Sequence, residues 1–489
     1  MSPTLIKIKA VAVALCLIAT CGCRDSTTGP KAQKPNVILY VIDGAAADLM
    51  SVYGYARRTT RYLERLAAEG AVFENAYSNS SVTKVSVPSF MTSLHCSVLG
   101  GLRSQSDPLP EQAVTMAERM RKAGYRTEVL TSNPYCGRIS SLDRGVDILR
   151  DTEMGEVRPS SADLHREFWR LREADPAEPY WVHFQPTDVH QPWASADPFT
   201  GPFISPADRL ILEQVLDRIT RTRGLSFEES IGKSDIDVAR FYQIAKKLYE
   251  ESLAFQDREI GKLVERLKKR GEWDRTLFIV AADHSQVSAG LPYLAPEVPP
   301  WEAPLLASHK SRIPMIFVWP GKIPAGRRIS QPVSMIDVLP TVLDLTGLPR
   351  AEVAQGQSLA PLLLGRTGWR PRPVVLDEFR FEGKYLFGSI EVIDGRWGAS
   401  LRIDQRPDDK KGARDRRRPA PLLVFDVRED PHALRSLHEQ RPDLVAKYSK
   451  ILGRLWKDHL ALARKFTRTG AIPMRPEEIE RLRSLGYLR

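Results

Sequence analysis

Two acidic residues, each directly after an apolar run, are the first candidates for chemistry in this chain. Residues 37–42 lead to Asp43, and residues 277–282 lead to Asp283 and His284. Such runs are typical of strands buried on both faces of a parallel sheet, where ligands bind at the carboxyl ends. Carboxylate oxygen and imidazole nitrogen together suit a divalent cation such as zinc, manganese or magnesium. The alternative is a structural role, because a strand-terminal Asp also caps helices and turns.

The elements that must position these residues alternate from residue 36 to about residue 365. Apolar runs predict strands, and longer stretches with a helical period predict helices. This alternation predicts an α/β fold with a doubly wound, mostly parallel sheet. The expected strands are 36–42, 126–131, 180–185, 276–282 and 313–319, and the expected helices are 61–69, 111–122, 239–271 and 337–346.

The pattern changes after about residue 370, where short apolar strands at 374–376 and 397–403 precede a helical stretch at 443–467. These elements predict a smaller C-terminal antiparallel sheet with a helix. A chain of 489 residues also exceeds the usual size of a single core. We therefore expect a catalytic domain at 36–368 and a C-terminal subdomain at 369–489.

The N-terminus has the pattern of an export signal. Lys7 and Lys9 precede an uncharged stretch at 10–20, which is too short to span a bilayer but suits the core of a signal peptide. A Cys-Gly-Cys sequence follows at 21–23. Small residues around a Cys at this point resemble the lipobox of bacterial lipoproteins, in which the Cys is acylated and becomes the new N-terminus.

This resemblance implies a lipoprotein signal peptide at 1–23 and a polar tether at 24–35. The acylated residue is expected to be Cys23, which follows a Gly, with Cys21 as the rival. An ordinary secretory signal with an incidental Cys is the alternative. Either form predicts an extracytoplasmic protein, and the lipid would anchor it to a membrane in the periplasm or at the cell surface.

Charge and cysteine content narrow the function classes. The formal net charge of +11 favours anionic substrates or lipid headgroups, and part of it is concentrated at 408–418. That basic run lacks interleaved aromatic residues, so nucleic-acid binding is not expected. Cys96 and Cys136 are the remaining thiols of the predicted mature chain. An oxidising compartment would allow them to pair, but their number does not require it.

Several ordered motifs together resemble one known family. The sulfatase family of the alkaline phosphatase superfamily has similar sequences in the same order, and the similarity extends over nearly all of the chain after the tether. The motifs are N-V-I-L-Y-V-I-D, the segment 53–77, F-Q-P-T-D-V-H-Q-P-W, the strand before Asp283, S-M-I-D-V-L-P-T-V-L-D-L-T-G-L-P, V-F-D-V-R-E-D-P and the closing L-R-S-L-G-Y-L-R.

The resemblance implies a nucleophilic oxygen bound to a cation. Most sulfatases make this oxygen by converting the Cys or Ser of a C/S-x-P-S-R motif to formylglycine. An ungapped alignment places Thr83 at the nucleophile, Ser86 at the motif Ser and Val87 at the Arg. A shifted register would instead place Ser86 at the nucleophile. Both registers lack the Arg, and Thr cannot be converted to formylglycine. An unmodified Thr nucleophile resembles the phosphodiesterase branch of the superfamily.

Further residues of this chain correspond to functional residues of the family. Asp43, Thr83, Asp283 and His284 would hold one divalent cation, whether calcium, magnesium, manganese or zinc, although Gly44 stands where many sulfatases have a further Asp ligand. Asp188 and His190 resemble the family's D-P-H, whose His contacts the ester or protonates the leaving group. His309 would contact the substrate, and Lys310 would be a catalytic cation. Asp188, His190 and His309 could also hold a second metal.

We therefore expect a metal-dependent, sulfatase-like hydrolase with Thr83, His190 and Lys310 as catalytic residues. Asp188, His309 and Ser86 would contact a sulfated or phosphorylated small molecule or glycan. The first alternative is a phosphodiester or phosphonate hydrolase, or a phosphoryl transferase, with Thr83 as nucleophile. The second alternative is a degenerate, non-catalytic binding protein.

Overall fold

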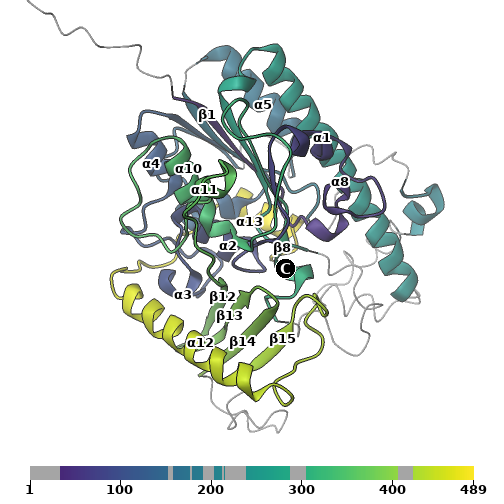
Figure 1. Ribbon diagram of the computed structural model, residues 1–489. Helices are drawn as coiled ribbons and strands as arrows, with labels where there is room; N and C mark the ends of the chain where they lie inside the picture. The colour runs from purple at the N-terminus through teal and green to yellow at the C-terminus, as the bar shows by residue number, and fades with distance from the viewer. Residues whose placement is uncertain are drawn as a thin grey trace, which may run out of the picture. The chain divides into compact units, whose positions relative to one another are not determined.

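Strand β1 (Asn36–Val41) lies inside an eight-stranded sheet. Its two neighbours, β7 (Thr276–Ala281) and β6 (Tyr180–Gln185), run parallel to it. All three strands are buried along their whole length, because helices cover both faces of the sheet (Figure 1). The apolar runs are thus confirmed as buried parallel strands.

The computed structural model describes residues 34–151, 158–176, 179–190, 203–211, 214, 238–286, 304–405 and 422–488. The predicted signal peptide at 1–23, most of the tether at 24–35 and the basic run at 408–418 lie outside these ranges. Within them, no helix is both long enough and apolar enough to cross a membrane.

The outer strands complete a mixed sheet in the order β10, β2, β9, β7, β1, β6, β4, β5. On one side, β4 (Arg126–Thr131) and β5 (Ile148–Arg150) continue the parallel arrangement. On the other side, β9 (Met315–Val318) is antiparallel to both β7 and β2 (Ala71–Phe73), and β10 (Arg327–Ile329) is parallel to β2. The predicted α/β class with a mostly parallel sheet is therefore confirmed, with β9 reversed.

Two groups of helices cover the sheet (Figure 1). Helix α4 (Met116–Lys122) starts later than the helix predicted at 111–122, because Thr115 and Glu118 form a capping box that fixes its first turn. On one face lie α1 (Arg61–Glu69), α5 (Ser161–Ala174) and α8 (Val238–Lys269), and on the other lie α2 (Thr83–Thr92), α4 (Met116–Lys122), α10 (Val338–Leu345) and α11 (Ala360–Leu363).

Short elements connect these layers. A three-stranded sheet joins β11 (Val333–Ser334), β3 (Ala76–Tyr77) and β8 (Arg312–Ile313). The short helices are α3 (Cys96–Leu99), α9 (Ser308–Ser311), η1 (Ala47–Leu49), η2 (Ser51–Tyr53), η3 (Pro134–Cys136), η4 (Arg138–Ser140), η5 (Trp273–Arg275) and η7 (Met335–Asp337).

The C-terminal part forms the predicted small antiparallel sheet. Its four strands are β12 (Val374–Glu382), β13 (Tyr385–Asp394), β14 (Trp397–Asp404) and β15 (Leu423–Asp426), paired in that order. Helix α12 (Pro442–Ala463) packs against this sheet through Leu444, Tyr448 and Leu452.

The last helix, α13 (Pro476–Ser484), leaves the small sheet and returns to the large one. Arg138 on η4 binds the Glu478 carboxylate with two guanidinium nitrogens, at 3.0 and 2.5 Å. Leu482 packs with Tyr135 and Ile139 in a small apolar cluster. The end of the chain is therefore attached beside the carboxyl edge of the large sheet.

Asp377 on β12 joins the small sheet to the large body. Its buried carboxylate accepts hydrogen bonds from the amides of Cys96 and Ser97 at 3.0 and 2.8 Å. Burial alone would raise the pKa of Asp377, but His95 and the other partners lower it. Cys96 itself is a buried free thiol, as is Cys136, so the structure contains no disulfide between them.

Replacing Asp377 by Asn should destabilise the protein. The amide oxygen of the Asn side chain can still accept one hydrogen bond, but the NH2 group of that side chain would face a main-chain N–H donor. The free energy of unfolding should therefore fall by about 2 kcal/mol. Urea denaturation would measure the change. Asp394→Asn, which removes a half-exposed carboxylate from the same sheet, is the matched control and should cost clearly less. Equal losses would contradict the junction role of Asp377.

Candidate active site

The β1–β7 pairing places two carboxylates side by side at the carboxyl edge of the sheet. The strands pair in register, with Val41 opposite Ala281, so Asp43 and Asp283 leave the sheet together. Gln185, at the end of neighbouring β6, donates one amide group to both carboxylates, at 2.9 and 3.1 Å. Both acids are fully buried. A like-charged, dehydrated pair of this kind favours bound cations.

Thr83 faces this carboxylate pair from the start of α2. Its Oγ1 lies 3.3 Å from Asp43 Oδ1 and 3.1 Å from His284 Nε2. The residue is buried and opens the helix, so its side chain and the first amides of α2 point toward the same edge. This geometry matches the predicted place of a nucleophilic oxygen.

Ser86, the rival nucleophile, is hydrogen-bonded to a main-chain carbonyl and another hydroxyl. Its hydroxyl donates to the main-chain carbonyl of Asp283 and lies 3.3 Å from the Ser78 hydroxyl. Ser86 thus links α2 by a hydrogen bond to the segment that follows β7. Val87, at the position of the family Arg, is fully buried in the main apolar core.

A divalent cation fits the donor atoms present. Single ligand atoms of Asp43, His190 and His284 lie within 4.8 Å of one another, and all three residues are buried. Asp283 adjoins them, with its carboxylate 3.6 Å from His284 Nε2. Carboxylate and imidazole donors that converge on a buried site are ligand types that divalent cations use in proteins. The predicted set gains His190 as a further candidate.

A second Asp ligand like that of many sulfatases would be strained at Gly44 in this chain. Gly44 adopts a left-handed backbone, with φ of 73°, and a Cβ there would lie 2.9 Å from Gln286 Oε1. Its amide donates to Asp283 Oδ1 at 3.1 Å. Gly44 therefore contributes a main-chain donor in place of a carboxylate.

Asp188 and His190 diverge from a single turn. The Asp188 carboxylate accepts from the amide of Ser161, the first residue of α5, and burial raises its pKa to about 6. His190 instead points at the site, with Nε2 3.9 Å from Asp43 Oδ1. Arg158 holds the turn by donating to the His190 carbonyl at 2.6 Å. Asp188 thus supports the turn that carries His190.

His309 and Lys310 lie on the short helix α9. His309 Nδ1 is 3.3 Å from Nδ1 of His432. Burial lowers the pKa of Lys310, while the negative charges of Glu391 and Glu378 act to raise it. Among the described residues, the side chains gathered closely enough for one ion include neither Asp188 nor His309. The structure does not assemble the proposed second metal site.

Three polar side chains of the site were not predicted. Asn133 Nδ2 donates to Asp43 Oδ2 at 2.8 Å, and Gln185 bridges the two acids. The Tyr487 hydroxyl lies 3.1 Å from Thr83 Oγ1. Asn133 and Gln185 follow or end predicted strands, so the rule that identified Asp43 could have found them. No local pattern of this kind marks Tyr487.

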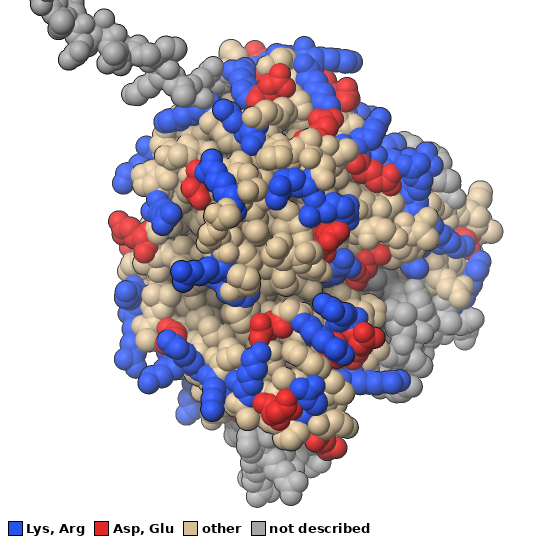
Figure 2. Space-filling model, viewed as in Figure 1, with Lys and Arg blue, Asp and Glu red and all other residues tan. Residues whose placement is uncertain are grey.

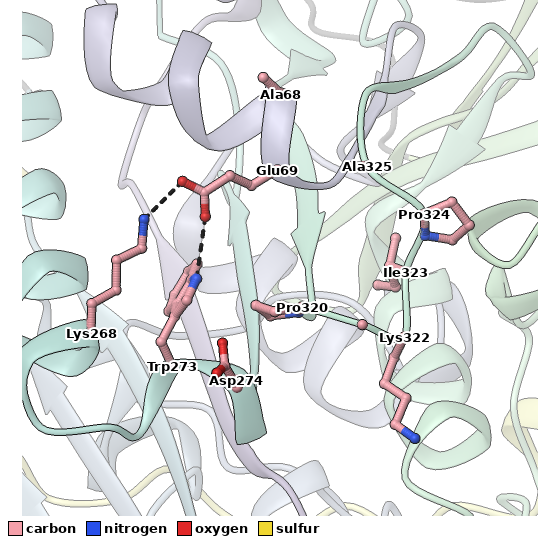
Figure 3. Close-up of a pocket in the computed structure, with 11 residues that line it drawn as sticks. Ala68, Glu69, Lys268, Trp273, Asp274, Pro320, Lys322, Ile323, Pro324 and Ala325 are labelled. Atoms are coloured by element: carbon pink, nitrogen blue, oxygen red, sulfur yellow. Dashed lines mark hydrogen bonds and ion pairs between the residues drawn. The ribbon is translucent and has the colours of Figure 1, made fainter.

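A separate pocket of about 680 Å³ lies near the opposite edge of the sheet (Figure 3). Trp273 lines it just before β7, whereas Asp283 follows that strand at its other end. Glu69 accepts hydrogen bonds there from Lys268 Nζ at 2.8 Å and Trp273 Nε1 at 3.2 Å. These polar groups satisfy one another, and the pocket has no part in the carboxylate site.

The visible surface does not gather its basic residues into one patch. Lys and Arg side chains are scattered over the face in Figure 2, and Asp and Glu lie among them. This face therefore shows no single basic patch that would mark an anion-binding surface.

Metal affinity should fall as the pH decreases below about 6. Burial and the neighbouring Asp43 raise the pKa of Asp283 to about 6. A carboxylate must lose its proton to bind a metal, so below that pH this residue should weaken affinity by about tenfold per pH unit. Calorimetric titration with zinc or manganese from pH 7.5 to 5 would measure this. Asp283→Asn should bind more weakly at pH 7.5 with a slope smaller by one proton, and wild-type affinity in that variant would contradict the assignment.

Comparison with known proteins identifies the family of this chain. A model of the family described as Sulfatase matches residues 35–348. An arylsulfatase from Clostridium perfringens is 24% identical, over 85% of this chain and 93% of its own. The phosphonate monoester hydrolase of Agrobacterium radiobacter has a TM-score of 0.65 at 18% identity, covering 87% of this chain and 96% of its own. A structure solved with its substrate D-glucosamine-2-N,6-O-disulfate has a TM-score of 0.64 at 18% identity, covering 88% and 99%. Because the family model spans more than half of the sequence, the chain belongs to the sulfatase family.

Proposed function

We propose that this protein is a metal-dependent hydrolase of sulfate esters with Thr83 as the nucleophile. The observation that carries the proposal is the position of Thr83 Oγ1 beside Asp43 and His284. The arylsulfatase relative supports a sulfate ester. The neighbour solved with a disulfated glucosamine supports a sulfated glycan as substrate.

The mechanism assigns separate tasks to the residues of the site. Asp43, Asp283 and His284 would hold the cation, which when bound lowers the pKa of a hydroxyl and neutralises ester oxygens. Thr83 Oγ1 would form a bond to sulfur while the bond from sulfur to the leaving oxygen breaks. His190 would give a proton to that oxygen and would take up the proton that Thr83 releases. Water would then cleave the ester on Thr83, releasing sulfate and restoring the hydroxyl.

A phosphonate or phosphodiester hydrolase is the second candidate. The identity of Thr83 favours this second candidate, because an unmodified hydroxyl stands at the position where most sulfatases have the precursor of formylglycine. The similarity to a phosphonate monoester hydrolase is in agreement. In either reaction Lys310 would add positive charge near the ester, and Asn133 and Gln185 would hold the carboxylates as neutral donors.

Turnover of two chromogenic esters would test both candidates. Nitrophenyl sulfate and bis-nitrophenyl phosphate would be offered to the metal-supplemented protein. Thr83→Ala should lower kcat by at least about a hundredfold, because the attacking oxygen is removed. Ser86→Ala, the matched loss of one hydroxyl on the same helix, should retain most activity. A loss confined to Ser86→Ala would show that the register is wrong.

We also propose that the protein is anchored at the cell envelope. Support comes from the sequence alone, in the charged, apolar and Cys-Gly-Cys segments up to Cys23. Cys23→Ala should move the protein from the membrane fraction to the soluble exported fraction, because one acyl-bearing residue is lost. Cys21→Ala is the control and should remain with membranes. The reverse result would assign the lipid to Cys21.

A further inference from the structure

The last residues of the chain form one wall of the carboxylate site. Helix α13 is held by the Arg138–Glu478 pair and by the burial of Leu482. Gly486, with φ of 77°, then turns the chain back toward the sheet. This turn presents Tyr487 to the site.

The ring of Tyr487 packs between two aromatic neighbours. Its centroid is 5.0 Å from that of Tyr135 and 5.3 Å from that of His190. Tyr135 directly follows Asn133 and Pro134 on η3, next to the strand β4. The ring therefore contacts residues from two different strand ends, and these contacts fix the direction of its hydroxyl.

The hydroxyl of Tyr487 meets three polar atoms. It lies 2.8 Å from His190 Nε2, 3.1 Å from Thr83 Oγ1 and 3.4 Å from Asn133 Nδ2. A neutral phenol has one hydrogen to donate and two lone pairs to accept with. Asn133 can only donate, so the phenol donates to either His190 or Thr83 and accepts from the other. In both cases one oxygen connects the nucleophile to the proposed acid.

We propose that Tyr487 is a positioning residue, which orients Thr83 Oγ1 and His190 Nε2 toward a common reacting group. This inference rests on the proposed function of Thr83 and His190. Thr83 also has a short contact to His284, so its rotamer is restricted from two sides. His190 has its turn fixed through its carbonyl by Arg158, and Tyr487 fixes its ring nitrogen. Such prior alignment is what lowers the entropic cost of attack.

The test removes only the hydroxyl. Tyr487→Phe keeps both ring contacts. Tyr448→Phe is the matched control, because its hydroxyl contacts Lys447 on α12 and Asp394 on β13. Tyr487→Phe should lower kcat about tenfold to a hundredfold while KM changes less than about threefold, since one aligning hydrogen-bond network is lost. Tyr448→Phe should leave both constants unchanged.

A second readout does not depend on turnover. Orthovanadate, an oxyanion that becomes five-coordinate at an attacking oxygen, would be titrated calorimetrically into each metal-loaded variant. Tyr487→Phe should bind it about tenfold more weakly than the wild type, with unchanged affinity for the metal alone. If the wild type cleaves neither nitrophenyl ester but vanadate still distinguishes Tyr487→Phe, the ester assignment fails and the positioning role stands.

Four results would overturn the positioning role. Unchanged kcat and vanadate affinity in Tyr487→Phe would show that the hydroxyl is idle. Faster turnover or tighter vanadate binding would show that it obstructs the site. A parallel loss of metal affinity would assign the effect to the cation. Failure of vanadate to bind the wild-type protein would contradict both the assignment of Thr83 as nucleophile and the alignment of the site.

Discussion

The proximity of two buried carboxylates is the constraint on which the rest of the site depends. Asp43 and Asp283 leave neighbouring parallel strands at the same level, where water cannot screen them. Charges in such a place must be neutralised or hydrogen-bonded. Gln185 and Asn133 supply neutral donors, and the remaining repulsion is a strong reason to bind a cation. The grouping of donors that could hold a cation is thus a consequence of strand register.

Every other functional group is brought to this pair by an element of its own. Helix α2 directs Thr83 at it, while Ser86 on the next turn fastens the helix to the strand end. The turn after β6 carries His190, and the C-terminal segment carries Tyr487. Because these elements are far apart in the sequence, the site forms only when the whole body has folded. Stability of the junction at Asp377 therefore bears on catalysis as well as on folding.

The sequence predicted the features that depend on local pattern. Buried strands are marked by their apolar runs, and the same runs led to Asp43 and Asp283. The features that the local pattern did not predict depend on contacts between residues far apart in the sequence. The reversal of β9 depends on its partners β7 and β2, and α13 is held by Arg138, which lies 340 positions from Glu478. Tyr487 reaches the site through that attachment, so the closing L-R-S-L-G-Y-L-R motif that contains it gave a family resemblance but no position.

If Val87 stands at the position of the family Arg, as the ungapped alignment predicts, the site would have to neutralise charge in another way. Val87 takes its place and lies wholly within the apolar core, so an Arg there would have to enter packed space. A hydroxyl nucleophile carries no second oxygen of its own, unlike the hydrated aldehyde of formylglycine. The described neighbours Asn133, Gln185 and Tyr487 are uncharged, so under the proposed function the positive charge at the ester would come mainly from the cation. Such a site depends more on the exact alignment of Thr83, and the hydroxyl of Tyr487 is placed to provide that alignment.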